Sequence, residues 1–137
     1  MAVLEIGSLA KRYGESTVFA NVNLTVRAGE FVAVVGESGV GKSTLLNCAA
    51  GLDTIDAGQV RVAGTDIHAL GESAQAVFRR HHLGFVFQAF HVLPHLTVAA
   101  NVGLPLLLPH APDPIRVSAM LSAVGLAGFE ARLPQTL

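Results

Sequence analysis

One short glycine-rich segment limits what this chain can fold into more than any other feature of the sequence. It runs Gly36-Glu37-Ser38-Gly39-Val40-Gly41-Lys42-Ser43-Thr44 and matches the pattern G-x-x-x-x-G-K-[ST]. A triphosphate concentrates negative charge, and backbone N–H groups surround it only where a loop curls tightly without bulky side chains, as glycines permit. The pattern arises by chance in roughly one chain of this length in a few hundred. The sequence therefore predicts a phosphate-binding loop, the P-loop, at residues 36–44.

The segments on either side of the P-loop suit a phosphate site. Before it, residues 31–35 form a continuous apolar run, which predicts a strand buried on both faces of a parallel sheet. After it, residues 42–50 read as a helix that Gly51 ends. Such a helix directs its free N–H groups and the positive end of its dipole toward the phosphates.

Three side chains at the start of this helix have predicted roles. Lys42 adds a full positive charge near the outer phosphates. Ser43 offers a hydroxyl to Mg²⁺, an ion that takes oxygen ligands. Thr44 is placed to contact an inner phosphate.

Hydrophobic periodicity and turn residues predict the remaining elements. The predicted strands are residues 3–6 as an edge strand, 21–27 as a half-buried strand, 59–63 and 85–87. The predicted helices are residues 72–82 and a segment that Asp113 and Pro114 begin and Gly125 closes. Residues 28–30 are expected to turn the chain. Alternating strands and helices indicate an α/β fold with at least one parallel sheet.

Composition and charge exclude several classes of protein. The chain is 51% hydrophobic and 14% charged, yet no apolar run reaches the ~18–20 residues of a membrane-spanning helix. Residues 1–10 lack a signal-peptide pattern, so we expect a cytoplasmic chain with apolar surface for a partner. A net charge of −1 without a long basic run argues against nucleic-acid binding.

The cysteine and the histidines carry less information. Lone Cys48 excludes an internal disulfide and is expected to be buried on the helix after the P-loop. Pro94 interrupts helical spacing between His91 and His95, so these histidines do not predict a metal site. We read the histidines as surface or partner-facing groups.

The P-loop alone leaves several classes of nucleotide-binding protein open. GTP-binding switch proteins need an N-K-x-D guanine reader, and no such string occurs. The chemistry of the P-loop does not distinguish small kinases from other P-loop proteins. The segments that flank the P-loop must therefore distinguish these classes.

Four flanking segments resemble one family. In order they are Lys11-Arg12-Tyr13-Gly14, Phe85-Val86-Phe87-Gln88-Ala89-Phe90, Leu93-Pro94-His95-Leu96-Thr97-Val98 and Asn101-Val102-Gly103-Leu104-Pro105. Nearly the whole chain resembles the ATP-binding subunits of ABC transporters, in the branch with lipoprotein-releasing, macrolide-export and cell-division subunits. The Phe-Val-Phe-Gln segment followed by Leu-Pro-x-Leu-Thr-Val is much more specific than the P-loop.

The resemblance implies roles for individual positions. Tyr13 resembles the aromatic residue that stacks on adenine, and Gln88 resembles the glutamine that reaches Mg²⁺ and the attacking water. The loop at about residues 89–98 would face a transmembrane subunit. Ala100 stands where this branch usually has Glu, so no membrane-subunit contact is assigned there.

Other features of the family are absent from the sequence. No strand predicted after the P-loop ends in Asp or Glu, and the Leu-Ser-Gly-Gly-Gln signature does not occur. Arg132, Pro134 and Leu137 resemble the lead-in to that signature. We therefore expect an incomplete nucleotide-binding domain, with an antiparallel β region and P-loop core at about 1–96 and the start of a helical subdomain at about 97–137.

The resulting expectation is a subunit that binds ATP with Mg²⁺. When complete, it would pair with a second copy and drive transport or extrusion through a transmembrane subunit, on the cytoplasmic face of the inner membrane. This chain alone would bind ATP without hydrolysing it. One alternative is a nucleotide-binding remnant with regulatory or no activity, and another is a small P-loop kinase.

Overall fold

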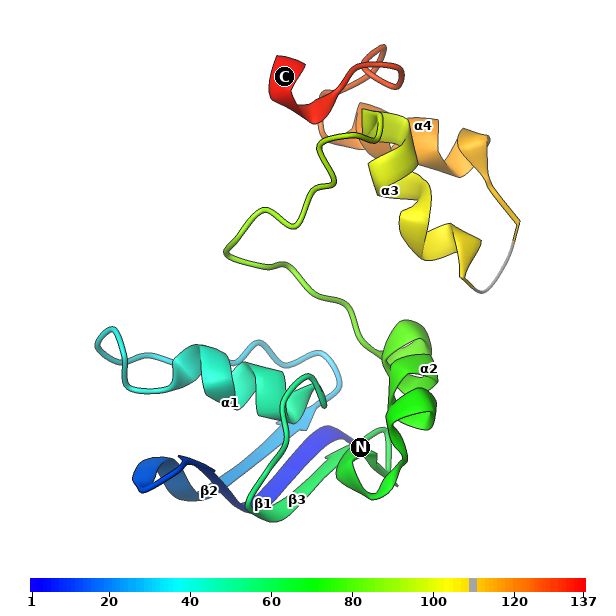
Figure 1. The fold of residues 1–137 in the computed structure, drawn as a ribbon. Coiled ribbons are helices and arrows are strands. Elements are labelled where there is room, and N and C mark those ends of the chain that lie inside the picture. The colour runs from blue at the N-terminus through cyan, green and yellow to red at the C-terminus, as the bar shows by residue number, and fades with distance from the viewer. Residues whose placement is uncertain (109–110) are drawn as a thin grey trace. The chain divides into compact units, whose positions relative to one another are not determined.

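The computed structural model describes residues 1–108 and 111–137 of the chain (Figure 1). The chain divides into two compact units, Met1–Gly84 and Phe85–Leu137. The P-loop lies in the first unit, and Gln88 lies in the second.

An antiparallel sheet forms the base of the first unit. Its strands are β1 (Ala2–Tyr13), β2 (Ser16–Arg27), β3 (Ala57–Val62) and β4 (Thr65–Asp66), in the order β2-β1-β3-β4. Val22, Leu24 and Val26 are half-buried while their neighbours are exposed, which confirms the alternation predicted for this strand. The predicted edge strand at residues 3–6 is wrong in its position, because β1 pairs with β2 on one side and with β3 on the other.

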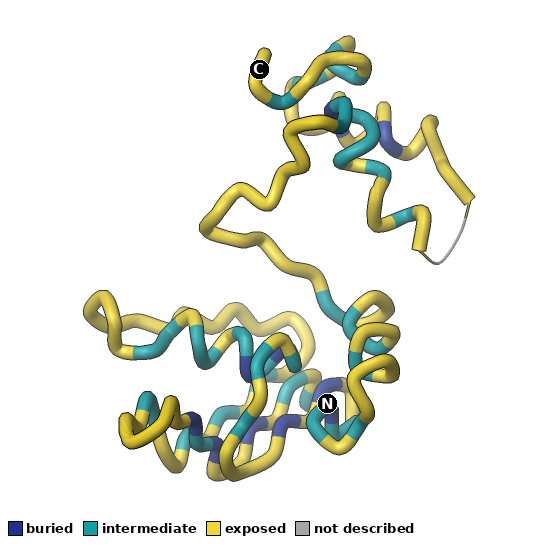
Figure 2. The backbone as a smooth tube through the Cα atoms, in the orientation of Figure 1, coloured by how far each residue is buried: buried dark blue, intermediate teal, exposed yellow. Residues whose placement is uncertain are grey.

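The core of the first unit lies between this sheet and the helices above it (Figure 2). Its buried residues are Ile6, Leu9, Cys48, Val60, Val62 and Ile67. Cys48 is fully buried on α1 (Lys42–Ala49), as the sequence predicts. Helix α1 therefore docks the end of the P-loop segment onto the sheet.

The second helix of this unit, α2 (Glu72–His82), has the predicted bounds. It follows a short 3-10 turn, η1 (Ile67–Ala69). The Gln75 side chain donates to the Ile67 carbonyl at 2.8 Å, and the Arg79 guanidinium donates to the Gly51 carbonyl at 2.8 Å. These bonds tie α2 to the end of α1.

Two apolar segments predicted as strands have no strand structure. Residues 31–35 and 85–87 are irregular and exposed, and among the described residues the sheet contains only β1 to β4. The sheet is antiparallel throughout, so the described chain does not form the predicted parallel sheet. A strand requires hydrogen-bonding neighbours, and a β-branched composition cannot supply them.

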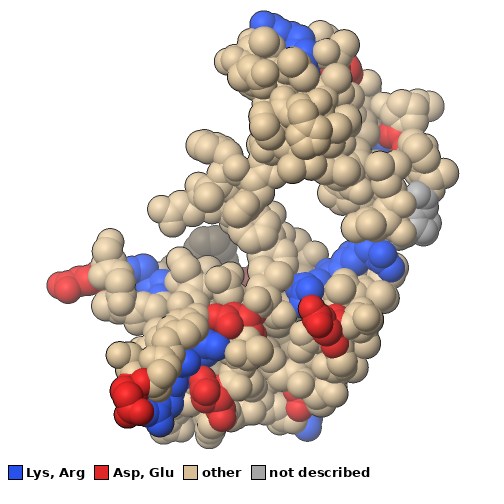
Figure 3. Space-filling view, in the orientation of Figure 1, with Lys and Arg blue, Asp and Glu red and all other residues tan. Residues whose placement is uncertain are grey.

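The second unit is built on two helices, α3 (Val98–Leu107) and α4 (Pro114–Ala123), around a core of Val98, Val117 and Leu121. The Asp113 side chain accepts a bond from the Arg116 N–H at 3.0 Å, which confirms the predicted N-cap. A final 3-10 turn, η2 (Pro134–Thr136), follows. On the face drawn in Figure 3, this unit carries few charged side chains.

None of the helices in the described part of the chain is long and apolar enough to cross a membrane.

Candidate nucleotide-binding site

The P-loop follows an irregular segment after β2, and its last three residues form the start of α1. Gly39 and Gly41 adopt positive φ angles of 84° and 100°, which L side chains rarely adopt. A Cβ atom on Gly41 would lie 2.5 Å from the Val18 Cγ1 atom, so both the backbone conformation and the space require glycine. The curled loop predicted from its glycines is therefore present.

The start of α1 exposes its backbone donors to the loop. The helix begins with the bond from the Leu45 N–H to the Gly41 carbonyl at 2.9 Å, and no side chain caps its N-terminus. The first N–H groups of a helix have no intrahelical partner and carry the positive end of the dipole. This end of α1 is therefore suited to a negatively charged group.

The Lys42 side chain folds back across the P-loop. Its ammonium donates to the Gly36 carbonyl at 2.5 Å and to the Glu37 carbonyl at 2.7 Å. An ammonium has three donors, so these contacts place the charge while leaving a further donor. The loop thus holds a cation at the uncapped start of α1, the arrangement expected of a phosphate site.

The other residues of the motif are open to solvent in varying degree. Glu37, Ser38, Val40 and Ser43 are exposed, whereas Thr44 is half-buried. The Ser43 hydroxyl is accessible and is an oxygen ligand of the kind that Mg²⁺ binds.

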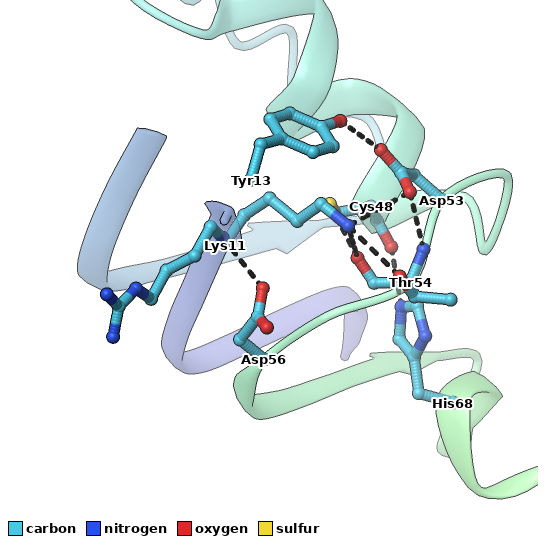
Figure 4. Close-up of polar contacts among 8 residues, drawn as sticks. Lys11, Tyr13, Cys48, Asp53, Thr54, Asp56 and His68 are labelled. Carbon is cyan, nitrogen blue, oxygen red and sulfur yellow. Dashed lines mark hydrogen bonds and ion pairs between the residues drawn. The ribbon is translucent and has the colours of Figure 1, made fainter. Parts of the chain in front are cut away.

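Tyr13 lies at the end of β1 in a hydrogen-bonded cluster that joins the sheet to the segment after α1 (Figure 4). Its hydroxyl donates to the Asp53 Oδ2 atom. The Lys11 ammonium donates to Asp53 Oδ1 at 3.0 Å, to the Thr54 carbonyl at 2.7 Å and to the Thr54 hydroxyl at 3.0 Å. A second acid, Asp56, accepts from the Arg12 N–H at 2.7 Å.

The cluster shifts the ionisation of its members. Hydrogen bonds from Tyr13 and then from Lys11 hold the pKa of Asp53 below its ordinary 3.8. The hydrogen bond to Asp53, followed by burial, raises the pKa of Tyr13 above 10.0. Burial lowers the pKa of Lys11, but the hydrogen bond and negative charge of Asp53 outweigh it, so the pKa lies above 10.5.

Lys11 and Asp53 were not among the site residues predicted from the sequence. Lys11 lies beyond the strand predicted at residues 3–6, and the pairing of β1 with β2 shifts register between Leu9 and Lys11, so side-chain alternation did not mark Lys11 as buried. The pairing of Lys11 with Asp53 spans 42 residues, and no local pattern reports it.

Gln88 is exposed in a segment without regular structure in the second unit. Its neighbour Phe87 stacks on Phe85 with ring centroids 5.4 Å apart and meets His91 edge-on at 4.7 Å. Phe90 and Val92 are exposed, as expected for residues 89–98, and Leu96 is half-buried. The contact of Gln88 with Mg²⁺ and water stays a prediction.

Comparisons with known proteins match the chain to one family. The ABC transporter family model matches residues 19–137. The Lipoprotein-releasing system ATP-binding protein LolD of Pseudomonas syringae pv. tomato is 43% identical, over 99% of this chain and 63% of that protein. The Macrolide export ATP-binding/permease protein MacB 1 of Yersinia pestis bv. Antiqua is 47% identical, over 76% of this chain and 17% of that protein.

A solved structure supports the same assignment. The dimeric structure of a post-hydrolysis state of the ATP-binding cassette MJ0796, bound to ADP and Pi, superposes with a TM-score of 0.87 at 33% identity. The match covers 98% of this chain and 62% of that one. The P-loop and the sequence and structure matches together place the chain in the ABC transporter family.

Proposed function

We propose that this chain binds Mg-ATP through residues 36–44, as the ATP-binding subunit of an ABC transporter. The observation that carries the proposal is the Lys42 ammonium, held by the Gly36 and Glu37 carbonyls beside the uncapped start of α1. The loop N–H groups and Lys42 would bind the phosphates, and Thr44 would contact an inner one. Ser43 would hold Mg²⁺, which shields the phosphate charge.

Two residues outside the P-loop complete the proposed site. Tyr13 would stack on adenine with its exposed ring, and Gln88 would reach Mg²⁺ and the attacking water. The half-exposed ring of Tyr13 supports the first role. The second rests on the family resemblance of residues 85–90.

The proposed partners are a transmembrane subunit and a second nucleotide-binding subunit, at the cytoplasmic face of the inner membrane. Exposed Phe90 and Val92 support a protein contact through residues 89–98, because such side chains are usually covered. We propose that residues 1–96 form the β region and P-loop core, and that residues 97–137 belong to a helical subdomain. The dimeric MJ0796 structure supports a paired assembly.

Hydrolysis requires a carboxylate that holds Mg²⁺ and another that polarises water. Neither strand predicted after the P-loop, at residues 59–63 and 85–87, ends in Asp or Glu. We therefore propose that this chain binds ATP without turning it over. Membership of the ABC transporter family disfavours the small kinase.

The test of ATP binding is the substitution Lys42→Ala in the 137-residue chain. Affinity for Mg-ATP should fall at least about tenfold, because a charge-assisted contact to phosphate is among the strong hydrogen bonds. Titration calorimetry measures the change. The control is Arg80→Ala, which removes an exposed positive charge from α2 of the same unit and should leave affinity unchanged. Equal affinity of Lys42→Ala and the parent chain would contradict the proposal.

A further inference from the structure

A buried cation fixes the geometry of the cluster around Tyr13. Lys11 is only 4% exposed, and its ammonium contacts the Asp53 carboxylate and two oxygens of Thr54. A buried charge is stable only while it is paired and hydrogen-bonded. The Asp53 carboxylate is therefore held in one place by Lys11 and by the Thr54 N–H, which donates to it at 2.8 Å.

The same carboxylate holds the Tyr13 side chain. One oxygen accepts from Lys11, and the other accepts from the Tyr13 hydroxyl (Figure 4). The Lys11 ammonium also lies 4.8 Å from the centroid of the Tyr13 ring, which is cation–π distance. The ring is thus held at its hydroxyl and over one face, although Tyr13 is 53% exposed.

We propose that Asp53 is a positioning residue for nucleobase binding, which with buried Lys11 holds the Tyr13 ring ready to stack on a purine. This inference rests on the proposed binding of ATP. Ordering a free side chain opposes association, so a ring already held in one orientation binds a flat base with less loss of entropy. Because Lys11 covers one face, the base stacks on the opposite face. Stacking reads little base identity, so ATP and GTP bind alike.

The chain offers a direct optical probe of this contact. Tyr13 is its sole tyrosine, and it has no tryptophan. Tyrosine emission therefore reports on this side chain alone. A carboxylate that accepts the phenol proton quenches that emission, so Asp53→Asn should increase it at neutral pH. An unchanged emission in the folded variant would show that Asp53 does not hold the Tyr13 hydroxyl, and the binding test decides whether this contact serves nucleotide binding.

The binding test compares the parent chain with Tyr13→Phe, Asp53→Asn and the double variant, using Mg-ATP and Mg-tripolyphosphate as ligands. Each single substitution should weaken ATP binding roughly three- to tenfold, the size expected from the ordering of one side chain. The double variant should bind no more weakly than either single variant, because both remove the same contact. Affinity for tripolyphosphate, which has no base, should not change.

Two of the variants separate a loss of the Tyr13–Asp53 contact from a loss of folding or of charge. Tyr13→Phe retains the Lys11–Asp53 ion pair, so it tests the contact even where Asp53→Asn disturbs folding. The control Asp56→Asn makes the same charge change at an acid that bonds to the Arg12 N–H, and it should leave both affinities unchanged.

Three results would overturn the inference. Unchanged ATP affinity in Tyr13→Phe and Asp53→Asn, with tripolyphosphate still bound, would remove the role of Asp53 and leave the P-loop proposal standing. Equal weakening of both ligands would assign the cluster to folding alone. Failure of the parent chain to bind either ligand would refute ATP binding itself, and the inference with it.

Discussion

At the scale of single residues, the electrostatics of the first unit depend on the Lys11–Asp53 pair. Asp53 is ionised and accepts bonds from Lys11, Tyr13 and the Thr54 N–H. Removing one partner of a buried ion pair is strongly destabilising, because the remaining charge stays buried without a partner. This loss exceeds the net stabilisation that the pair itself provides. The pair therefore makes the stability of this unit depend on pH at both ends of the scale.

The direction of that dependence follows from the pKa shifts. The pKa of Asp53 is lowered, so its contribution is present above pH 3.8 and is lost as the pH falls through the folded value. The pKa of Lys11 is raised, so its contribution is present below pH 10.5 and is lost as the pH rises through the folded value. We expect Asp53→Asn to lower the free energy of unfolding by about 1–2 kcal/mol at neutral pH and to flatten its decline in acid.

Urea unfolding followed by far-ultraviolet circular dichroism, from neutral to acidic pH, measures this change. The Asp56→Asn variant should retain the acid dependence of the parent chain, because Asp56 does not contact Lys11. An acid dependence that Asp53→Asn leaves unchanged would contradict the prediction.

At the scale of elements, the bulged pairing of β1 with β3 places Lys11 beside Asp53. The register between the two strands shifts between Gly7 and Ala10, and Ser8 within the bulge has a positive φ of 48°. Bulges re-aim the side chains that follow them. Gly58 on β3 accommodates the bulge, because a Cβ there would lie 2.5 Å from the Ser8 carbonyl oxygen.

We predict that Gly58→Ala destabilises the chain by about 3 kcal/mol or more. Its φ of 90° is unfavourable for alanine, and the added Cβ meets backbone atoms of β1 that cannot rotate away. The control is Gly64→Ala, which has a φ of 80° but no atom within 4 Å of the added Cβ. It should cost about 1 kcal/mol from the backbone conformation alone. Similar losses in the two variants, in the same urea experiment, would show that β1 yields to the added methyl group.

At the scale of the whole molecule, exposed apolar side chains determine solution behaviour. Phe31 and Phe90 are each 94% exposed, and Val35 is 86% exposed. Monomeric proteins rarely display contiguous apolar surface beyond a few hundred Å². The apolar segments at residues 31–35 and 85–92 are therefore surfaces that require cover.

We expect the 137-residue chain to bind a hydrophobic dye strongly and to self-associate through these exposed segments. Phe31→Ser should lower dye fluorescence without changing the far-ultraviolet spectrum, because this side chain packs on nothing. Phe78→Ser should not lower it, because Phe78 packs against the core of the first unit. Dye fluorescence and sedimentation velocity provide the measurements. A monomer with weak dye binding would refute the expectation.

The sequence by itself determined the elements whose signals act over a few residues. The P-loop, the bounds of α2, the cap of α4 at Asp113 and the alternation within β2 were all readable, because glycine φ angles, caps and side-chain periodicity are local. The P-loop was also the part of the candidate site that the sequence specified most completely, since its glycines, Lys42 and Ser43 are consecutive in the chain.

Only the tertiary structure decided what depends on distant partners. It placed β1 at the centre of the sheet, left residues 31–35 without strand neighbours and joined Lys11 to Asp53 across 42 residues. Strand pairing and buried ion pairs need groups from separate parts of the chain, so no local pattern specifies them. For that reason the sequence indicated Tyr13 but not the carboxylate and ammonium that hold its ring.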